Sequence, residues 1–178
     1  NGDSRLEFLK KAAMIPGIYV PSLYEVTYKE NGTIESFLPK EAGIPERVEK
    51  QLVMEMTESV YPEKPLVPFI KATQDRVVLE IMRGCIRGCR FCQAGMIYRP
   101  VREKNVEHLK ELAYKMLKNT GHEEISLSSL SSSDYRSLEE LVTFLIDTFH
   151  GKGVNVSLPS LRIDAFSLDV MSKVQDVK

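Results

Sequence analysis

Residues 77–95 read VVLEIMRGCIRGCRFCQAG, and this stretch decides how the rest of the chain is interpreted. Its first five residues are mostly aliphatic and β-branched, which favours a short buried strand. A loop rich in glycine and cysteine follows directly. It contains all three cysteines of the chain, at positions 85, 89 and 92. An odd number of closely spaced thiols cannot form a paired disulfide framework, so the three side chains need a common explanation.

Strand and helix patterns alternate from residue 76 onward. The predicted strands cover residues 77–81, 125–130 and 154–158. The predicted helices cover residues 103–118 and 138–149, with a third beginning at Ser167. This alternation indicates right-handed crossovers and a parallel sheet, open or closed into a barrel. Ligands of such folds gather at the carboxyl ends of the strands, which is where the unusual motifs of this chain lie.

The first 75 residues show a different pattern. Their predicted elements are an amphipathic helix, a hairpin and a second helix, at residues 4–14, 23–38 and 45–56. Asn31-Gly32 predicts a type I′ turn within the hairpin. Three prolines, Pro62, Pro65 and Pro68, then interrupt regular structure. We therefore expect a small α+β N-terminal segment at residues 1–75 and a core domain at residues 76–178.

Composition excludes several classes of protein. The chain has 178 residues, of which 43% are hydrophobic and 28% charged, as in ordinary soluble domains. A formal net charge of -1 gives no electrostatic argument for nucleic acid. No run of about 18 apolar residues predicts a membrane-spanning helix, and the pattern of a signal peptide is absent. With its clustered thiols, the chain is expected in a reducing compartment, the cytoplasm.

The cysteine loop is suited to an iron–sulfur cluster. Three thiolates can converge on one face of a cubane because the glycines let the backbone turn tightly. Three protein ligands leave one iron open, which is typical of a metal site that performs chemistry. Zinc is the alternative, with His108 or His122 as a fourth ligand, but zinc sites usually show paired C-x2-C units and this chain has no second pair.

The spacing C-x3-C-x2-C of Cys85, Cys89 and Cys92, with Phe91 before the third cysteine, resembles the signature of the radical S-adenosylmethionine (SAM) superfamily. The resemblance implies a [4Fe-4S] cluster whose unique iron is chelated by SAM. It implies reductive cleavage of SAM to a 5′-deoxyadenosyl radical that abstracts hydrogen from a substrate, with an electron donor such as flavodoxin or ferredoxin. It also implies a partial (β/α)6 TIM barrel, and it places Phe91 near the adenine.

Longer stretches are similar to an uncharacterised bacterial subgroup of this superfamily, namely residues 83–102, 132–135 and 157–164. Members often carry an N-terminal cobalamin-binding-like domain and are similar to methylthiotransferases. The resemblance therefore implies methylthiolation or methylation, with cobalamin held by a domain outside these residues. No motif names the substrate. Only the first three or so βα units of the barrel are present, so we expect the chain to be an incomplete catalyst.

The serine tract after the second strand lies where the superfamily usually has a Gly-Gly-Glu-type motif against the SAM amino group. This sequence departs from that motif and offers Ser129, Ser131 and Ser132 instead. Their hydroxyls and the exposed backbone carbonyls are candidates to bind the ammonium. The alternative is a serine-rich turn in which Ser133 or Asp134 caps the next helix.

Basic residues after the strands are further candidates. Arg162 is suited to grip the SAM carboxylate or a substrate anion, and a salt bridge to Asp164 is its structural alternative. Tyr98, Arg99 and Arg102 either guard the cluster and contact substrate or form a solvated helix entrance. Two other functions stay open at this point. One is an iron–sulfur electron-transfer protein without SAM cleavage, and the other is a binding-only relative.

Overall fold

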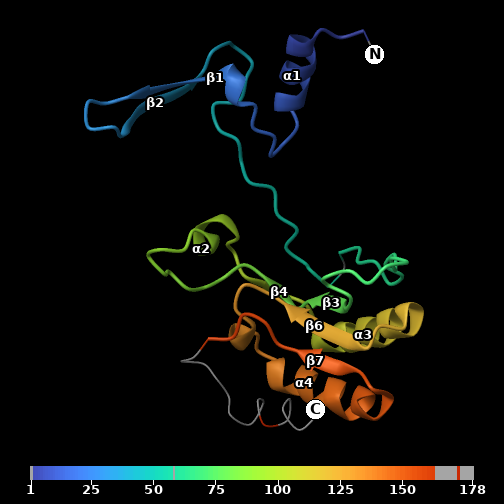
Figure 1. Ribbon diagram of the computed structural model, residues 1–178. Helices are drawn as coiled ribbons and strands as arrows, with labels where there is room; N and C mark the ends of the chain where they lie inside the picture. The colour runs from blue at the N-terminus through green and yellow to red at the C-terminus, as the bar shows by residue number, and fades with distance from the viewer. Residues whose placement is uncertain (1, 58, 163–171, 173–178) are drawn as a thin grey trace. The chain divides into compact units, whose positions relative to one another are not determined.

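The computed structural model describes residues 2–57, 59–162 and 172 (Figure 1). By packing, the chain divides into two compact units, Asn1–Val53 and Met54–Lys178. This division is based on packing alone. The predicted boundary at residue 75 marks where the core domain begins in the sequence, and it stays a prediction.

The second unit is built on a three-stranded parallel sheet, which confirms the predicted α/β class. The strands are β3 (Val77–Glu80), β6 (Glu124–Ser128) and β7 (Asn155–Ser157), in the order β3-β6-β7. All are parallel, with Leu79 opposite Leu127 and Ile125 opposite Val156. The three predicted strands are therefore adjacent in one sheet, and their carboxyl ends lie at one edge.

Two helices connect these strands and bury the core (Figure 1). Helix α3 (Val106–Thr120) begins at Asn105, whose Oδ1 accepts hydrogen bonds from the backbone of Glu107 and His108. Helix α4 is Leu138–Phe149. Fully buried aliphatic side chains of the helices, among them Leu109, Leu141 and Leu145, pack on buried side chains of the sheet, namely Val77, Leu79, Ile125 and Leu127. This core holds the edge that carries the cysteine loop.

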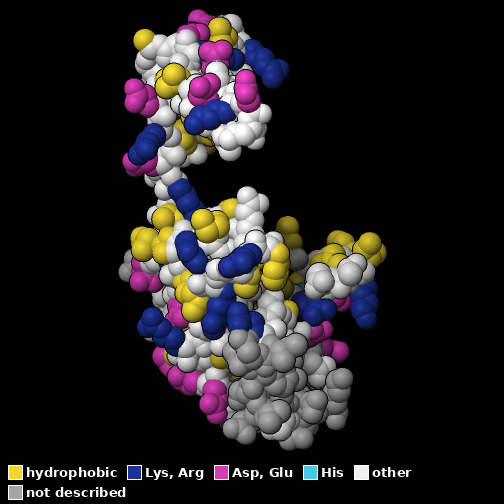
Figure 2. Space-filling view, turned by 90° about the vertical axis from the view of Figure 1, so that its left-hand side faces the viewer, with side chains coloured by type: hydrophobic (Ala, Val, Ile, Leu, Met, Phe, Trp, Pro, Cys, Tyr) yellow, Lys and Arg dark blue, Asp and Glu magenta, His cyan; other side chains and the backbone are white. Residues whose placement is uncertain are grey.

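The structure shows three parallel strands with their connecting helices, and their closure into a partial barrel stays a prediction. The predicted third helix, beginning at Ser167, lies outside the described residues. Among the described residues, we find no helix with the length and apolarity needed to span a membrane. Hydrophobic and basic side chains lie next to each other on the face shown in Figure 2.

The first unit contains the predicted helix and hairpin. Helix α1 (Arg5–Ala13) begins with a capping box, in which the Ser4 side chain accepts from Glu7 N and the Glu7 carboxylate accepts from Ser4 N. A 3-10 turn, η1 (Pro21–Leu23), precedes the antiparallel strands β1 (Tyr24–Tyr28) and β2 (Ile34–Pro39). The small core of this first unit consists of Ala13, Val20, Leu23, Tyr24 and Ile44.

The predicted type I′ turn is wrong, although the hairpin is confirmed. Gly32 has a φ of 79°, whereas Asn31 does not have a positive φ. Lys29 N donates to Thr33 O, and Gly32 N donates to Lys29 O, both at 2.9 Å. This is a three-residue loop with glycine in the left-handed position. Asn31 Oδ1 accepts from the backbone and hydroxyl of Thr33, and this local bond holds Asn31 outside the left-handed region.

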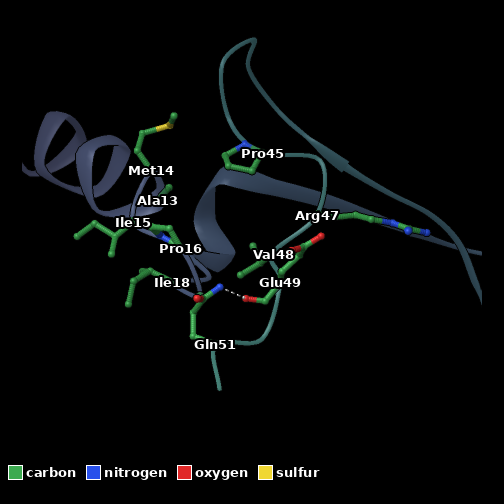
Figure 3. A pocket seen from close by; sticks show the side chains of 11 residues that line it. Ala13, Met14, Ile15, Pro16, Ile18, Pro45, Arg47, Val48, Glu49 and Gln51 are labelled. Carbon is green, nitrogen blue, oxygen red and sulfur yellow. Dashed lines mark hydrogen bonds between the residues drawn. The ribbon is translucent and has the colours of Figure 1, made fainter. Parts of the chain in front are cut away.

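The predicted helix at residues 45–56 is also wrong, because the described structure there is irregular. Val48 packs against the core of the first unit, whereas Leu52 and Val53 are 37% and 56% exposed, so the apolar face that the pattern suggested is not buried as a whole. A helix this short is marginal without such packing. Residues 45–51 instead line a shallow pocket with the turn that follows α1, where Gln51 Nε2 donates to Glu49 O (Figure 3).

Candidate functional site

The cysteine loop, residues 84–101, leaves the sheet after β3 and is closed at its base. Strand β4 (Met82–Arg83) pairs antiparallel with β5 (Arg102–Glu103). Lys104 N adds a hydrogen bond of 2.9 Å to Ile81 O. Within the loop lies the short helix α2 (Ala94–Ile97). The two ends of the loop are therefore held together at the sheet edge. The predicted helix at 103–118 starts later, at Val106, because residues 102–103 belong to β5.

Two glycines let the loop pack against itself. Gly84 has a φ of 98°, and a Cβ there would lie 2.6 Å from Tyr98 O and 2.8 Å from Pro100 O. A Cβ on Gly95 would lie 2.5 Å from Arg87 O. Both distances are too short for any side chain to be accommodated without moving backbone. The outgoing and returning halves of the loop thus touch through their main chains.

The Arg99 side chain binds the main chain of the cysteine loop. Its guanidinium donates to the carbonyls of three consecutive residues, at 3.4 Å to Cys85, 3.2 Å to Ile86 and 3.4 Å to Arg87. Arg99 itself is exposed, so the alternative of a solvated side chain stays open for it. That alternative is wrong for Arg102, which is buried and donates through Nε to Pro100 O. These arginines organise the loop.

The three thiols are free and accessible. Cys85 is half-buried, and Cys89 and Cys92 are exposed, with Cys92 N donating to Cys89 O at 3.0 Å. Among the described residues, no group of three or more Cys, His, Asp or Glu side chains is arranged around a single ion. A cubane binds each thiolate through a different iron, so its ligands need not meet at one point. Three accessible thiols in one closed loop fit that donor set.

Of the two histidines named as alternative zinc ligands, His108 lies in the first turn of α3, where its backbone nitrogen donates to the Asn105 cap. Its ring Nε2 is buried without a hydrogen-bond partner among the described residues. His122 Nδ1 lies 3.4 Å from Asp75 Oδ1, beside the start of β6. That end of the sheet is opposite to the end that carries the cysteine loop.

The serine tract joins the carboxyl ends of β6 and β7. Ser132 is fully buried; its hydroxyl donates to Pro159 O and shares a hydrogen bond with Ser129 Oγ, both at 2.9 Å. Ser132 N donates to Ser160 O at 3.1 Å. Ser131 is buried as well, and it directly precedes the 3-10 turn η2 (Ser132–Asp134). Much of the tract is thus committed to holding two loops together.

A pocket of about 250 Å³ lies beside the cysteine loop at the carboxyl ends of β3 and β6. The residues that line it are Glu80, Met82, Arg83, Gly84, Tyr98, Ser128, Ser129 and Leu130. Arg83 donates two hydrogen bonds to the Glu80 carboxylate, at 2.7 and 2.8 Å. These bonds lower the pKa of Glu80, so the pair is ionised at neutral pH. Of the three predicted serines, Ser129 is the one that lines this pocket.

Asp134 connects the serine tract to the cysteine loop. Its carboxylate accepts two hydrogen bonds from the Arg87 guanidinium, one of them 3.0 Å long from Nε. The Arg87 guanidinium holds the pKa of Asp134 below its ordinary value. The expected alternative, a cap for the next helix, is wrong, because α4 begins after Ser137 without a side-chain cap. Ser133 Oγ instead accepts from the backbone nitrogen of Arg162 at 3.1 Å.

The remaining predicted residues lie around this edge. Phe91 is 94% exposed, so its ring is free to cover a ligand. The backbone nitrogen of Arg162 donates to Ser133 Oγ, so the main chain of Arg162 lies beside the serine tract. Asp164, its alternative partner, lies outside the described residues.

Lys104 is a feature that sequence reasoning missed. It is 2% exposed, and its ammonium lies 3.9 Å from the centroid of the Tyr61 ring. Burial lowers the pKa of Lys104. Tyr61 donates to Val78 O at 2.6 Å, and Tyr135 donates to Lys104 O at 3.0 Å. Because Lys104 follows a run of arginines and Tyr61 lies among prolines, the pattern gave no sign that the two side chains pack together.

Comparison with known proteins decides the family. The model of the radical SAM superfamily matches residues 79–177, more than half of the chain. The chain belongs to the radical SAM superfamily. Membership implies a [4Fe-4S] cluster and SAM as the cofactors of this radical SAM protein. It also indicates an enzyme of the radical SAM type.

A relative of the radical SAM chain is an uncharacterized protein of Methanocaldococcus jannaschii. The two are 34% identical over 131 residues, which cover 68% of this chain and 29% of the relative. The chain thus spans less than a third of that protein's length, so activity, substrate and partners of the whole protein are matters for proposal.

Proposed function

We propose that this chain carries the cluster- and SAM-binding part of a radical SAM enzyme, with Cys85, Cys89 and Cys92 as the ligands of a [4Fe-4S] cluster. The observation that carries the proposal is the closed loop that presents three free thiols at the carboxyl edge of a parallel sheet. When bound and reduced, the cluster supplies the electron that cleaves SAM to methionine and a 5′-deoxyadenosyl radical, which abstracts hydrogen from a substrate.

The residues around the loop divide the work of holding SAM. Ser129 lines the pocket beside the loop and offers its hydroxyl to the SAM ammonium. Ser132 is fully buried and bonded to Pro159 and Ser160, so its part is to hold the tract in shape. Ser131 is buried as well, and its carbonyl closes the turn by accepting from Asp134 N. The exposed ring of Phe91 packs on the adenine. Arg162, whose main chain is bonded to Ser133 in the tract, grips the carboxylate of SAM.

The electron enters from an acidic partner such as flavodoxin or ferredoxin. The exposed charged side chains of the described segment 83–104 are all basic, namely Arg83, Arg90 and Arg99. The same loop also carries exposed hydrophobic side chains, among them Ile86, Phe91 and Met96. Complementary charge of this kind steers protein association.

A loop with free thiols also suits a cytoplasmic protein, because the cytoplasm keeps thiols reduced.

The reaction itself is proposed as methylthiolation or methylation, with cobalamin or a second cluster supplied by a domain outside these residues. The core at residues 76–178 then forms the first half of a (β/α)6 barrel. The competing function is electron transfer through the cluster without SAM cleavage. The pocket beside the loop favours the SAM enzyme, because electron transfer alone requires no ligand cavity at the cluster.

The test is the metal content of the full-length protein after anaerobic reconstitution, in wild type and in Cys89→Ala. We expect about four irons and four sulfides per chain in wild type, and loss of the cluster in the variant. Addition of SAM is expected to change the EPR spectrum of the reduced cluster. One bound zinc without sulfide would refute the proposal, and a cluster whose spectrum ignores SAM would favour electron transfer.

A further inference from the structure

The ion pair between Arg87 and Asp134 joins parts of the chain that are 47 residues apart. Arg87 lies in the cysteine loop, between the first and second cysteines. Asp134 ends the 3-10 turn η2 in the serine tract, and its side chain is only 7% exposed. A bidentate bond to a carboxylate that is shielded from water has more defined geometry than a surface ion pair.

The main chain of Asp134 is fixed by hydrogen bonds within the serine tract. Its backbone nitrogen donates to Ser131 O at 3.0 Å, which closes the turn. Ser132 fixes that turn to the segment after β7 through Pro159 and Ser160. The carboxylate is therefore attached to two strand ends, and its position follows the sheet.

Arg87 is held on the other side of the same bond. Its carbonyl is one of the three that accept from Arg99, and it lies against Gly95. The main chain at Arg87 is thus fixed inside the loop, and its side chain is fixed to the sheet edge. Any movement of Cys85 or Cys89 relative to the serine tract must stretch this connection.

We propose that Asp134 is a positioning residue for the cluster. Through Arg87 it sets where the cysteine ligands stand relative to the serine tract, and thereby how the cluster and SAM face each other. This inference rests on the proposed function, since it takes the three cysteines to be cluster ligands. Residues that orient metal ligands in this way typically change metal affinity or activity about 10–100-fold when they are replaced.

Asp134→Asn tests the inference, because it keeps the shape of the side chain and removes the charge and one acceptor oxygen. We expect the reconstituted full-length variant to lose its cluster to an iron chelator about 10-fold faster than wild type. We also expect a weakened SAM-induced change in the EPR spectrum, which a general loss of stability would not produce in molecules that retain the cluster. Asp134→Glu, which restores a carboxylate, should recover part of both properties.

The matched control is Glu124→Gln. Glu124 pairs with Arg76 in another partly buried ion pair, at the opposite end of β6 from the cysteine loop. This variant should keep wild-type cluster retention and EPR response. Equal cluster loss in Asp134→Asn and Glu124→Gln, or wild-type behaviour of Asp134→Asn, would overturn the inference while leaving the proposed function intact. A wild-type protein that assembles no cluster would overturn both.

Discussion

Replacing Gly84 with alanine should break the packing of the cysteine loop. The new Cβ would stand 2.6 Å from Tyr98 O and 2.8 Å from Pro100 O, where ordinary contacts begin at 3.4 Å. Both obstacles are backbone atoms, so no side chain can turn away to make room. The φ of 98° adds a cost of roughly 1–3 kcal/mol for a residue other than glycine. The two effects act on the same residue, so we expect a loss in unfolding free energy of at least about 2 kcal/mol.

Gly88→Ala is the control, because Gly88 lies in the same loop without a positive φ and has open space around its Cα. Urea unfolding of both apo proteins measures the global cost, and hydrogen exchange of the loop amides measures a local opening. After reconstitution, iron and sulfide content should fall in Gly84→Ala and stay at the wild-type value in Gly88→Ala. Equal stability, exchange and cluster content in the two variants would refute the reasoning.

Two further predictions concern the core beneath the loop. Leu127 is fully buried in the central strand, so Leu127→Ala should lower the unfolding free energy by about 2–5 kcal/mol in urea titrations; a loss below that range would mean that the core is looser than described. The pKa of Lys104 is lowered by burial from an ordinary value of 10.5. The unfolded chain therefore binds more protons between the two values, so wild-type stability contains a contribution that rises with pH in this window. Lys104→Met should lack that rise and be the more stable protein below the window, as urea unfolding at a series of pH values would show; parallel pH profiles would contradict it.

Periodicity and cysteine spacing carried most of what could be predicted. Strands 77–81 and 125–130 and helix 138–149 were found because their hydrophobic side chains face one core, and a pattern records that directly. The predicted helix at 45–56 is wrong because an apolar pattern in the sequence cannot show whether the folded chain provides a core for all of those side chains. The turn at Asn31-Gly32 failed because a side-chain bond from Asn31 to Thr33 competes with the turn that the dipeptide usually forms.

The place of the cysteine loop at the sheet edge was predictable from the sequence, and the contacts that support the loop were much less so. Three cysteines at fixed spacing indicate a cluster by themselves. The bond between Arg87 and Asp134 joins residues far apart in sequence, and neither position is unusual in its own neighbourhood. The commitment of Ser132 to Pro159 depends in the same way on how two loops meet. Contacts of this kind are products of the folded sheet edge, and no local pattern contains them.

The paired base formed by β4 and β5 has a consequence for how the cofactor arrives. A peptide that must wrap around a metal loses its chain entropy at the moment of binding, and that loss is subtracted from the affinity. Here the two ends of residues 84–101 are already joined, and Arg99 and the two glycines have already fixed the path between them. Most of the ordering is completed when the domain folds, so the proposed cluster need not act as the template for its own site.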